Sequence, residues 1–175
     1  QRHVYGPQVE DEAEHAFTSA ILEVSGIRQR RIYFVTGHGE PRIEGDYRIA
    51  SDALRDNLFD VREIDLLGQG IPPDAAAVVL AGPQQPLAPS ELDSLTSHLE
   101  GGGGLVVLVN PNPQPELRQL LADWWIGVGD GYVVDPVSNV APNPDVPLVS
   151  RDRNAFQLTR IYFPGATSVE PRVGA

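Results

Sequence analysis

The sequence predicts an α/β domain with a doubly wound, mainly parallel sheet, a flavodoxin-like three-layer sandwich. Two observations predict this class. Short β-branched runs recur along the chain, and stretches with apolar residues at three- and four-residue spacing separate them. Strands that alternate with helices imply right-handed crossovers and helices on both faces of the sheet. A length of 175 residues fits one hydrophobic core, so we expect a single domain over residues 1–175.

The N-terminal part of the chain predicts a helix followed by the first strand. Apolar residues recur at helical spacing from Val9 to Val24, which indicates an amphipathic helix within residues 8–25. Residues 31–36 are a β-branched and aromatic run closed by Gly37, which predicts a strand buried on both faces. The next predicted elements are a helix at 45–58, a strand at 61–66 and a strand at 75–81.

The alternation continues to the end of the predicted core, residues 31–136. A helix face begins near Ser90, with Asp93 as a weak capping partner, and ends at the glycines 101–104. Because a strand follows these glycines, they indicate a helix stop rather than a phosphate-binding loop. The last predicted core elements are a strand at 105–109, a helix at 117–125 and a strand at 132–135.

Two further expectations concern the C-terminal half. Trp124 and Trp125 fall on the apolar stripe of the last helix, so we expect at least one of them to pack in the core. Residues 137–175 are rich in proline and predict an irregular region, in which we interpret 141–147 as a loop. Within it, residues 158–163 predict a strand at a sheet edge.

Charge and composition exclude several classes of function. The chain has 13 basic and 24 acidic residues and a net charge of −11, so we predict no nucleic-acid partner. It has no cysteine, which excludes a disulfide framework, a thiol nucleophile and a cysteine-ligated zinc. The histidines show no metal-ligand spacing, and we predict no metal and no cofactor. Because the chain begins with glutamine and lacks methionine, we expect it to be a segment of a longer protein.

Polar residues follow the predicted strands at their carboxyl ends, where open parallel sheets bind ligands. The candidate ligand-binding residues are Gly37, His38, Gly39, Glu40, Pro83, Asn110 and Asp135. In the Gly-His-Gly-Glu turn, the glycines permit close approach of the backbone, while an imidazole and a carboxylate share a small space. Three interpretations are open: a structural turn bonded to neighbouring loops, a ligand site, or a catalytic pair. No serine or cysteine stands in a nucleophile-elbow pattern, so we assign no catalytic residue.

Several segments, taken in order, resemble the auxiliary domain of uncharacterised ABC-type transport systems. That family includes the gliding-motility transporter component GldG and is related to a subunit of intraflagellar transport. The segments that carry the resemblance are Phe17–Ile21, Ile32–Pro41, Leu80–Pro83, Leu87–Glu91, Gly102–Leu105, Trp125–Gly127, Val133–Pro136 and Phe163–Val169. One departure is that Asn154–Thr159 replaces the family's frequent His-Pro-Ile-Thr, so a role for that histidine does not carry over.

The resemblance implies a non-catalytic, extracytoplasmic domain on the periplasmic or outer face of the cell membrane. It would be tethered by transmembrane segments outside this chain and would work beside the permease and ATPase subunits of a transporter. The implied fold is similar to that of class I glutamine amidotransferases. Their nucleophile is missing, because the turn after the third strand reads Gly82-Pro83-Gln84.

The sequence therefore leaves three functions open. The first is a domain that binds a small molecule, sugar or peptide, or that scaffolds the transporter. The second is a hydrolase on sugar or peptide that uses His38 and Glu40 with Asp135. The third is an interaction module in which the acidic surface and an edge strand meet a protein partner. Self-association through that edge would give a homodimer. A closed rim on which His38, Glu40, Asn110 and Asp135 converge would favour ligand binding or catalysis. A filled rim with an exposed tryptophan or edge strand would favour interaction.

Overall fold

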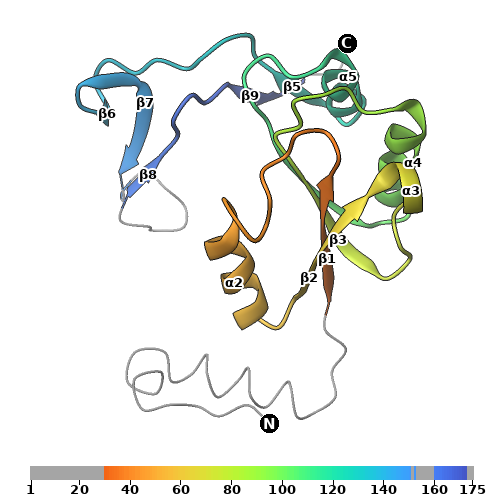
Figure 1. Ribbon diagram of the computed structural model, residues 1–175. Helices are drawn as coiled ribbons and strands as arrows, with labels where there is room; N and C mark the ends of the chain where they lie inside the picture. Colours follow the sequence, from red (N-terminus) through yellow and green to blue (C-terminus); the bar gives the residue numbers. More distant parts are fainter. Residues whose placement is uncertain (1–29, 151, 153–159, 173–175) are drawn as a thin grey trace, which may run out of the picture.

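A parallel sheet organises the part of the chain that the computed structural model describes, which is residues 30–150, 152 and 160–172 (Figure 1). Its strands are β1 (Arg31–Thr36), β2 (Asp60–Asp65), β3 (Ala75–Ala81) and β4 (Gly104–Leu108), in the order β2-β1-β3-β4. All three pairings are parallel. The predicted fold class is confirmed, and the helix predicted within residues 8–25 lies outside the described residues.

The central strand β1 is buried on both faces, as its composition predicts. Ile32 and Phe34 belong to one apolar cluster, with Val61 of β2 and Val79 of β3. The alternate residues Tyr33 and Val35 belong to a second cluster on the other face. Because side chains alternate across a strand, a run of large apolar residues fills two cores at once.

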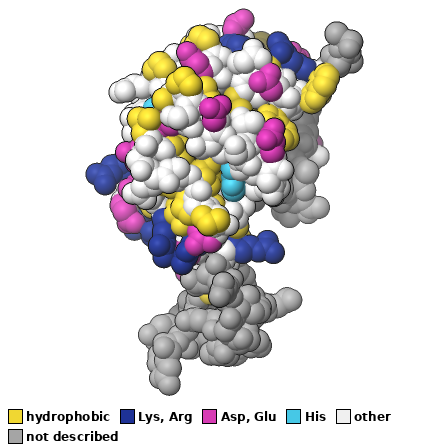
Figure 2. Space-filling model, turned by 90° about the vertical axis from the view of Figure 1, so that its right-hand side faces the viewer, with side chains coloured by type: hydrophobic (Ala, Val, Ile, Leu, Met, Phe, Trp, Pro, Cys, Tyr) yellow, Lys and Arg dark blue, Asp and Glu magenta, His cyan; other side chains and the backbone are white. Residues whose placement is uncertain are grey.

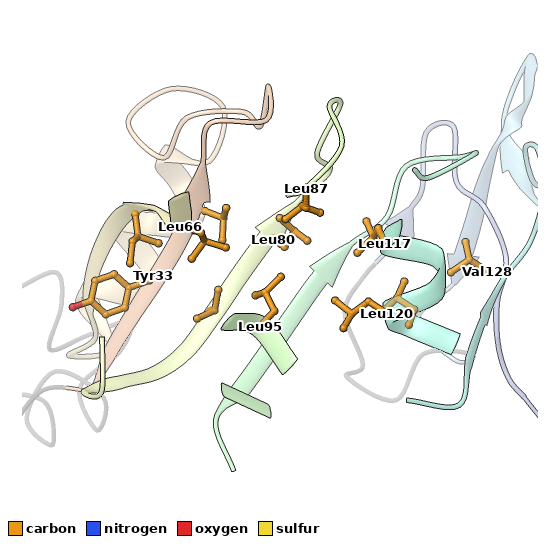
Figure 3. Packing of buried hydrophobic residues seen from close by; sticks show 12 residues of the cluster. Tyr33, Leu66, Leu80, Leu87, Leu95, Leu117, Leu120 and Val128 are labelled. Carbon is orange, nitrogen blue, oxygen red and sulfur yellow. The ribbon is translucent and has the colours of Figure 1, made fainter. Parts of the chain in front are cut away.

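Helices cover both faces of the sheet. The helix α2 (Arg48–Asp56) lies on the first face, where Leu54 packs against that cluster. The other face carries α3 (Leu66–Gln69), α4 (Pro89–Glu100) and α5 (Pro115–Asp123). Figure 3 shows their contribution to the larger core: Leu66, Leu95 and Leu117 belong to one apolar cluster with Leu80 of β3.

The prediction of a strand at 132–135 is wrong. The fifth strand is β5 (Ile126–Val128), which pairs antiparallel with β9 (Val169–Pro171) rather than with β4. Residues 132–135 are instead held by isolated bonds: Val133 N–H donates to Ala166 O at 2.8 Å, and Asp135 N–H donates to Pro144 O at 2.9 Å. As a consequence, β4 is an edge strand of the parallel sheet.

The proline-rich region is more regular than expected. A second sheet has the order β6-β7-β8, formed by β6 (Asn139–Val140), β7 (Asn143–Ser150) and β8 (Arg160–Tyr162). The interpretation of 141–147 as a loop is therefore wrong over Asn143–Pro147, whereas β8 confirms an edge strand within 158–163. Prolines fit in β7 because their carbonyls still accept bonds, as Pro147 O does from Phe163 N–H at 3.0 Å.

In the described ranges, the structure contains no helix with the length and apolarity needed to cross a membrane.

Candidate functional site

The turn after β1 is packed against the loop after β3. Gly37 and Gly39 have φ angles of 117° and 82°, a region that favours glycine. A Cβ atom on Gly39 would lie 3.2 Å from Gln84 Cβ, so a side chain there would crowd the second loop. Between the two glycines, His38 O accepts the N–H groups of Gln84 and Gln85 at 2.8 and 3.0 Å. The backbone of the turn is thus a junction between two loops.

The imidazole of His38 is buried between two carboxylates. His38 is 5% exposed, and the side chains of Glu40 and Glu91 are fully buried. Its Nε2 lies 2.9 Å from Glu91 Oε2, and its Nδ1 lies 3.3 Å from Glu40 Oε1. Glu40 also holds the turn itself, since its Oε2 accepts the His38 N–H at 2.7 Å. Sequence reasoning brought His38 and Glu40 together correctly but missed Glu91.

Glu91 is placed by the start of α4. The helix begins at Pro89, and Glu91 Oε2 accepts the Ala88 N–H at 2.7 Å. Glutamate at the third helical position is typical of this back-bond, and proline is typical of the first turn. The cap predicted at Ser90 with Asp93 is therefore wrong. A proline followed two residues later by glutamate was the signal that could have placed both the helix start and the carboxylate.

Few polar atoms of this cluster are available to a ligand. His38 Nδ1, Glu40 Oε1 and Glu91 Oε1 are buried without a hydrogen-bond partner among the described atoms. The 3.3 Å approach of His38 Nδ1 to Glu40 Oε1 lacks hydrogen-bond geometry. A group of three or more histidine, aspartate or glutamate side chains able to hold a metal ion does not occur in the described part of the chain. The buried contact between His38 and Glu91 therefore joins the turn after β1 to the start of α4.

The loops after β3 and β4 meet beside this junction. Gly82 N–H donates to Leu108 O at 2.8 Å, and Asn110 Nδ2 donates to Gly82 O at 3.3 Å. Gly82 has a φ of 62°, and a Cβ atom there would lie 2.9 Å from Asn110 Nδ2. The next residue, Pro83, is buried. The structure thus brings six of the candidate residues to one edge: Gly37, His38, Gly39, Glu40, Pro83 and Asn110.

Asp135 is placed elsewhere, in the turn that leads into the second sheet. Its Oδ1 accepts the N–H groups of Val137 and Ser138 at 2.9 and 2.8 Å, and its carbonyl accepts Asn139 Nδ2 at 2.8 Å. Figure 1 shows the segment before β6 well separated from the turn after β1. The prediction failed here because it relied on a fifth parallel strand ending at Asp135.

Both tryptophans are exposed, so the expectation that at least one packs in the core is wrong. Trp124 is 41% and Trp125 is 61% exposed. The helix α5 ends at Asp123, and Trp125 has a φ of 62°, so the chain turns away before the apolar stripe can continue. Trp125 O then accepts the N–H of Arg172, beyond β9, at 2.8 Å.

Comparisons with known proteins agree with this fold. A family described as an ABC-type uncharacterized transport system matches residues 29–172. Among solved structures, the chain is similar to the N-terminal domain of mmIFT52, with a TM-score of 0.63 and 20% identity, over 80% of this chain and 68% of that one. At this identity the likeness shows the fold alone. No curated protein matches the chain.

Proposed function

The chain belongs to this ABC-type transport-system family, and from that premise we propose that it is a non-catalytic auxiliary domain that binds protein subunits of the transporter. Its direct partner is the permease, which works together with the ATPase subunit. In this proposal the domain lies on the extracytoplasmic side and is tethered by membrane segments outside this chain. The extracytoplasmic placement rests on the family resemblance of the sequence.

The observation that carries the proposal is the filled carboxyl edge of the parallel sheet. Open sheets of this type bind small ligands where the loops leave a crevice at that edge. Here His38 is 5% exposed, and its partners Glu40 and Glu91 have fully buried side chains. The imidazole of His38 and the carboxylate of Glu40, which sequence reasoning offered to a ligand, are instead used in contacts within the fold. This geometry supports a structural junction.

The same observation disfavours a hydrolase that uses the Gly-His-Gly-Glu turn. A general base must reach within hydrogen-bond distance of the proton that it removes. The His38 ring faces Glu91 at 2.9 Å and Glu40 at 3.3 Å, and Asp135 lies in another turn. A substrate would have to displace these buried contacts before it met the imidazole.

Surfaces outside this edge are better suited to a protein partner. Trp124 and Trp125 are exposed, and β4 ends the parallel sheet. Tryptophan is enriched at the centres of protein interfaces, and an open edge strand is a template for a further strand. An exposed tryptophan beside an edge strand is what an interaction module is expected to present.

Co-purification tests the proposed function. The full-length protein, tagged and expressed with its permease and ATPase, is purified from gently solubilised membranes. We expect the permease to co-purify with the wild type and with Asp46→Lys, a change of an exposed residue in the loop before α2. A permease and ATPase that assemble and purify without the tagged protein would contradict the proposal.

The side of the membrane can be tested with an introduced thiol. The chain contains no cysteine, so Asp46→Cys provides one exposed label. We expect a membrane-impermeant maleimide to label this variant in intact cells, with the unchanged protein as the control for thiols elsewhere. Labelling only after the cells are opened would place the domain on the cytoplasmic side.

A further inference from the structure

The outer edge of β4 is open in the described structure. The strand pairs with β3 on one side and is the last in the sheet order. Leu108 O accepts from Gly82 N–H, which follows β3, so the polar backbone of Leu108 faces inward. Successive residues of a strand direct these groups to opposite sides, so Val107 directs its N–H and C=O outward. Such groups are available to a further strand.

A cavity of about 290 Å³ adjoins this edge. It lies between β4, the end of α4, the C-terminal part of α5 and the ribbon of β5 with β9. Every residue that lines it is apolar, and they include Leu105, Val107, Leu120, Trp124, Ile126 and Val169. Because β5 pairs with β9, the cavity is left beside an open edge.

The opposite face of β4 is apolar and exposed as well. Val106 and Leu108 are 48% and 43% exposed. Their register partners on β3 are Val79 and Ala81, which belong to the cluster on the α2 face. A strand added to β4 would therefore meet apolar surface on both faces. Its alternate side chains would enter the cavity or lie against Val106 and Leu108.

Exposed acidic residues are next in sequence to three residues that line the cavity. Exposed Glu100, Asp123 and Glu170 each adjoin a lining residue, whereas Arg172 is the basic residue that follows β9. Figure 2 shows acidic and apolar side chains interspersed on the face that carries α4 and α5. A net charge of −11 also makes two copies of the chain repel each other. Charge complementarity thus favours a basic occupant over a second copy.

We propose that the open edge of β4 and its apolar cavity bind an extended segment of another transporter subunit by strand addition. The segment has alternating apolar residues and is flanked by lysine or arginine. Main-chain bonds to the edge supply affinity, and apolar side chains in the cavity supply specificity. This proposal rests on the proposed function and names the partner's chemistry.

A peptide probe tests the recognition chemistry. It is a short fluorescent peptide in which valine and leucine alternate with serine between terminal arginines. Controls are a scramble with contiguous apolar residues and a version with terminal glutamates. We expect fluorescence anisotropy to show that the chain binds the first peptide and binds both controls about tenfold more weakly or worse. Equal binding of all three, or no binding, would overturn the proposal.

Two variants of the chain test separately the contribution of the β4 edge and the contribution of the acidic residues to peptide binding. Val107→Pro removes one outward N–H and leaves the β3 pairing intact, so we expect about tenfold weaker binding. Joint replacement of Glu100, Asp123 and Glu170 by lysine should weaken binding at low salt, with Asp46→Lys as the matched control. Thermal melts confirm that each variant folds, and if Val107→Pro does not fold, the charge variant decides. Peptide binding unchanged in the folded variants would overturn the site.

Photocrosslinking identifies the occupant in the assembled transporter. A p-benzoylphenylalanine replaces Trp124, which lines the cavity and is partly exposed. We expect a crosslink to a basic-flanked apolar segment of the permease, and its loss with Val107→Pro. A crosslink to a second copy or to residues 1–29 of the same chain would overturn the proposal. If co-purification persists in that case, the proposed function stands and only this site is wrong.

Discussion

At the scale of single residues, His38 shows why burial decides the interpretation of a motif. An ionisable side chain is costly to bury unless hydrogen bonds or charges compensate. Glu91 lies 2.9 Å from one ring nitrogen, and Glu40 lies 3.3 Å from the other. Glu40 belongs to the same turn as His38, whereas Glu91 belongs to the first turn of α4, so the imidazole ties the turn after β1 to the start of α4. His38, which lies between two glycines, therefore has a structural role.

We predict that His38→Ala destabilises the fold by about 1–3 kcal/mol, because Glu91 loses its partner while remaining buried. Urea unfolding followed by circular dichroism measures the difference. His98→Ala is the matched control, since His98 makes its bond to Gly104 O in an exposed setting. Equal stability of the wild type and His38→Ala would show that the imidazole does not support the loops.

Alanine substitutions at two glycines distinguish the cost of backbone strain from the cost of steric conflict. Gly82 has a φ of 62° and would place a Cβ atom 2.9 Å from Asn110 Nδ2. Gly102 has a φ of 83° with nothing within 4 Å of such an atom. We expect Gly102→Ala to cost about 1 kcal/mol and Gly82→Ala to cost more, because the contact adds to the strain. Denaturant unfolding that ranks the two variants in the opposite order would contradict the packing of Asn110 on Gly82.

At the scale of elements, local pattern predicts best where one strand must fill two cores. The strand at 31–36 was predicted with its observed bounds, because large apolar residues occupy four consecutive positions between Ile32 and Val35. The strand at 132–135 was not formed, although its pattern is similar. After α5 the chain forms β5, which pairs with β9, and no described segment pairs with the outer edge of β4. Sequence pattern carries no signal for that tertiary choice.

The start of β2 provides a prediction on pH. Hydrogen bonds from Arg62 and then from Arg31 hold the pKa of Asp60 below its ordinary value of 3.8. A carboxyl group with a lowered pKa in the folded state stabilises the fold above its unfolded pKa, and this contribution is lost as pH falls through the folded pKa. We expect Asp60→Asn to be modestly less stable than the wild type near neutral pH, and the gap to close below pH 3.8.

Denaturant unfolding across this pH range measures the gap. Asp46→Asn changes an exposed carboxylate of the loop before α2 and serves as the control. The Asp60 side chain is 25% exposed, so the effect should also diminish with added salt. A gap that stays constant from neutral to acidic pH would contradict the assignment of this charge cluster to the fold.

At the scale of the whole molecule, the sequence predicted the class of fold and one edge of the site. It placed Gly37, His38, Gly39 and Glu40 at the end of a central strand, because parallel strands end at a common edge. It could not predict that this edge is filled, since Glu91 reaches it from α4 through contacts between distant segments. It missed the apolar cavity beside β4 for the same reason. Both features depend on packing between elements rather than on the pattern within one.

We propose that the strand-end edge is a structural junction and that the domain recognises protein. A thermal-shift screen of sugars, peptides, nucleotides and divalent ions, run on the wild type and on His38→Ala, tests this most directly. A ligand at about 100 times its dissociation constant stabilises a fold by roughly 2.7 kcal/mol. We predict no ligand whose stabilisation depends on His38. A ligand that stabilises the wild type and loses that effect in the folded His38→Ala variant would contradict the claim and make this edge a recognition site.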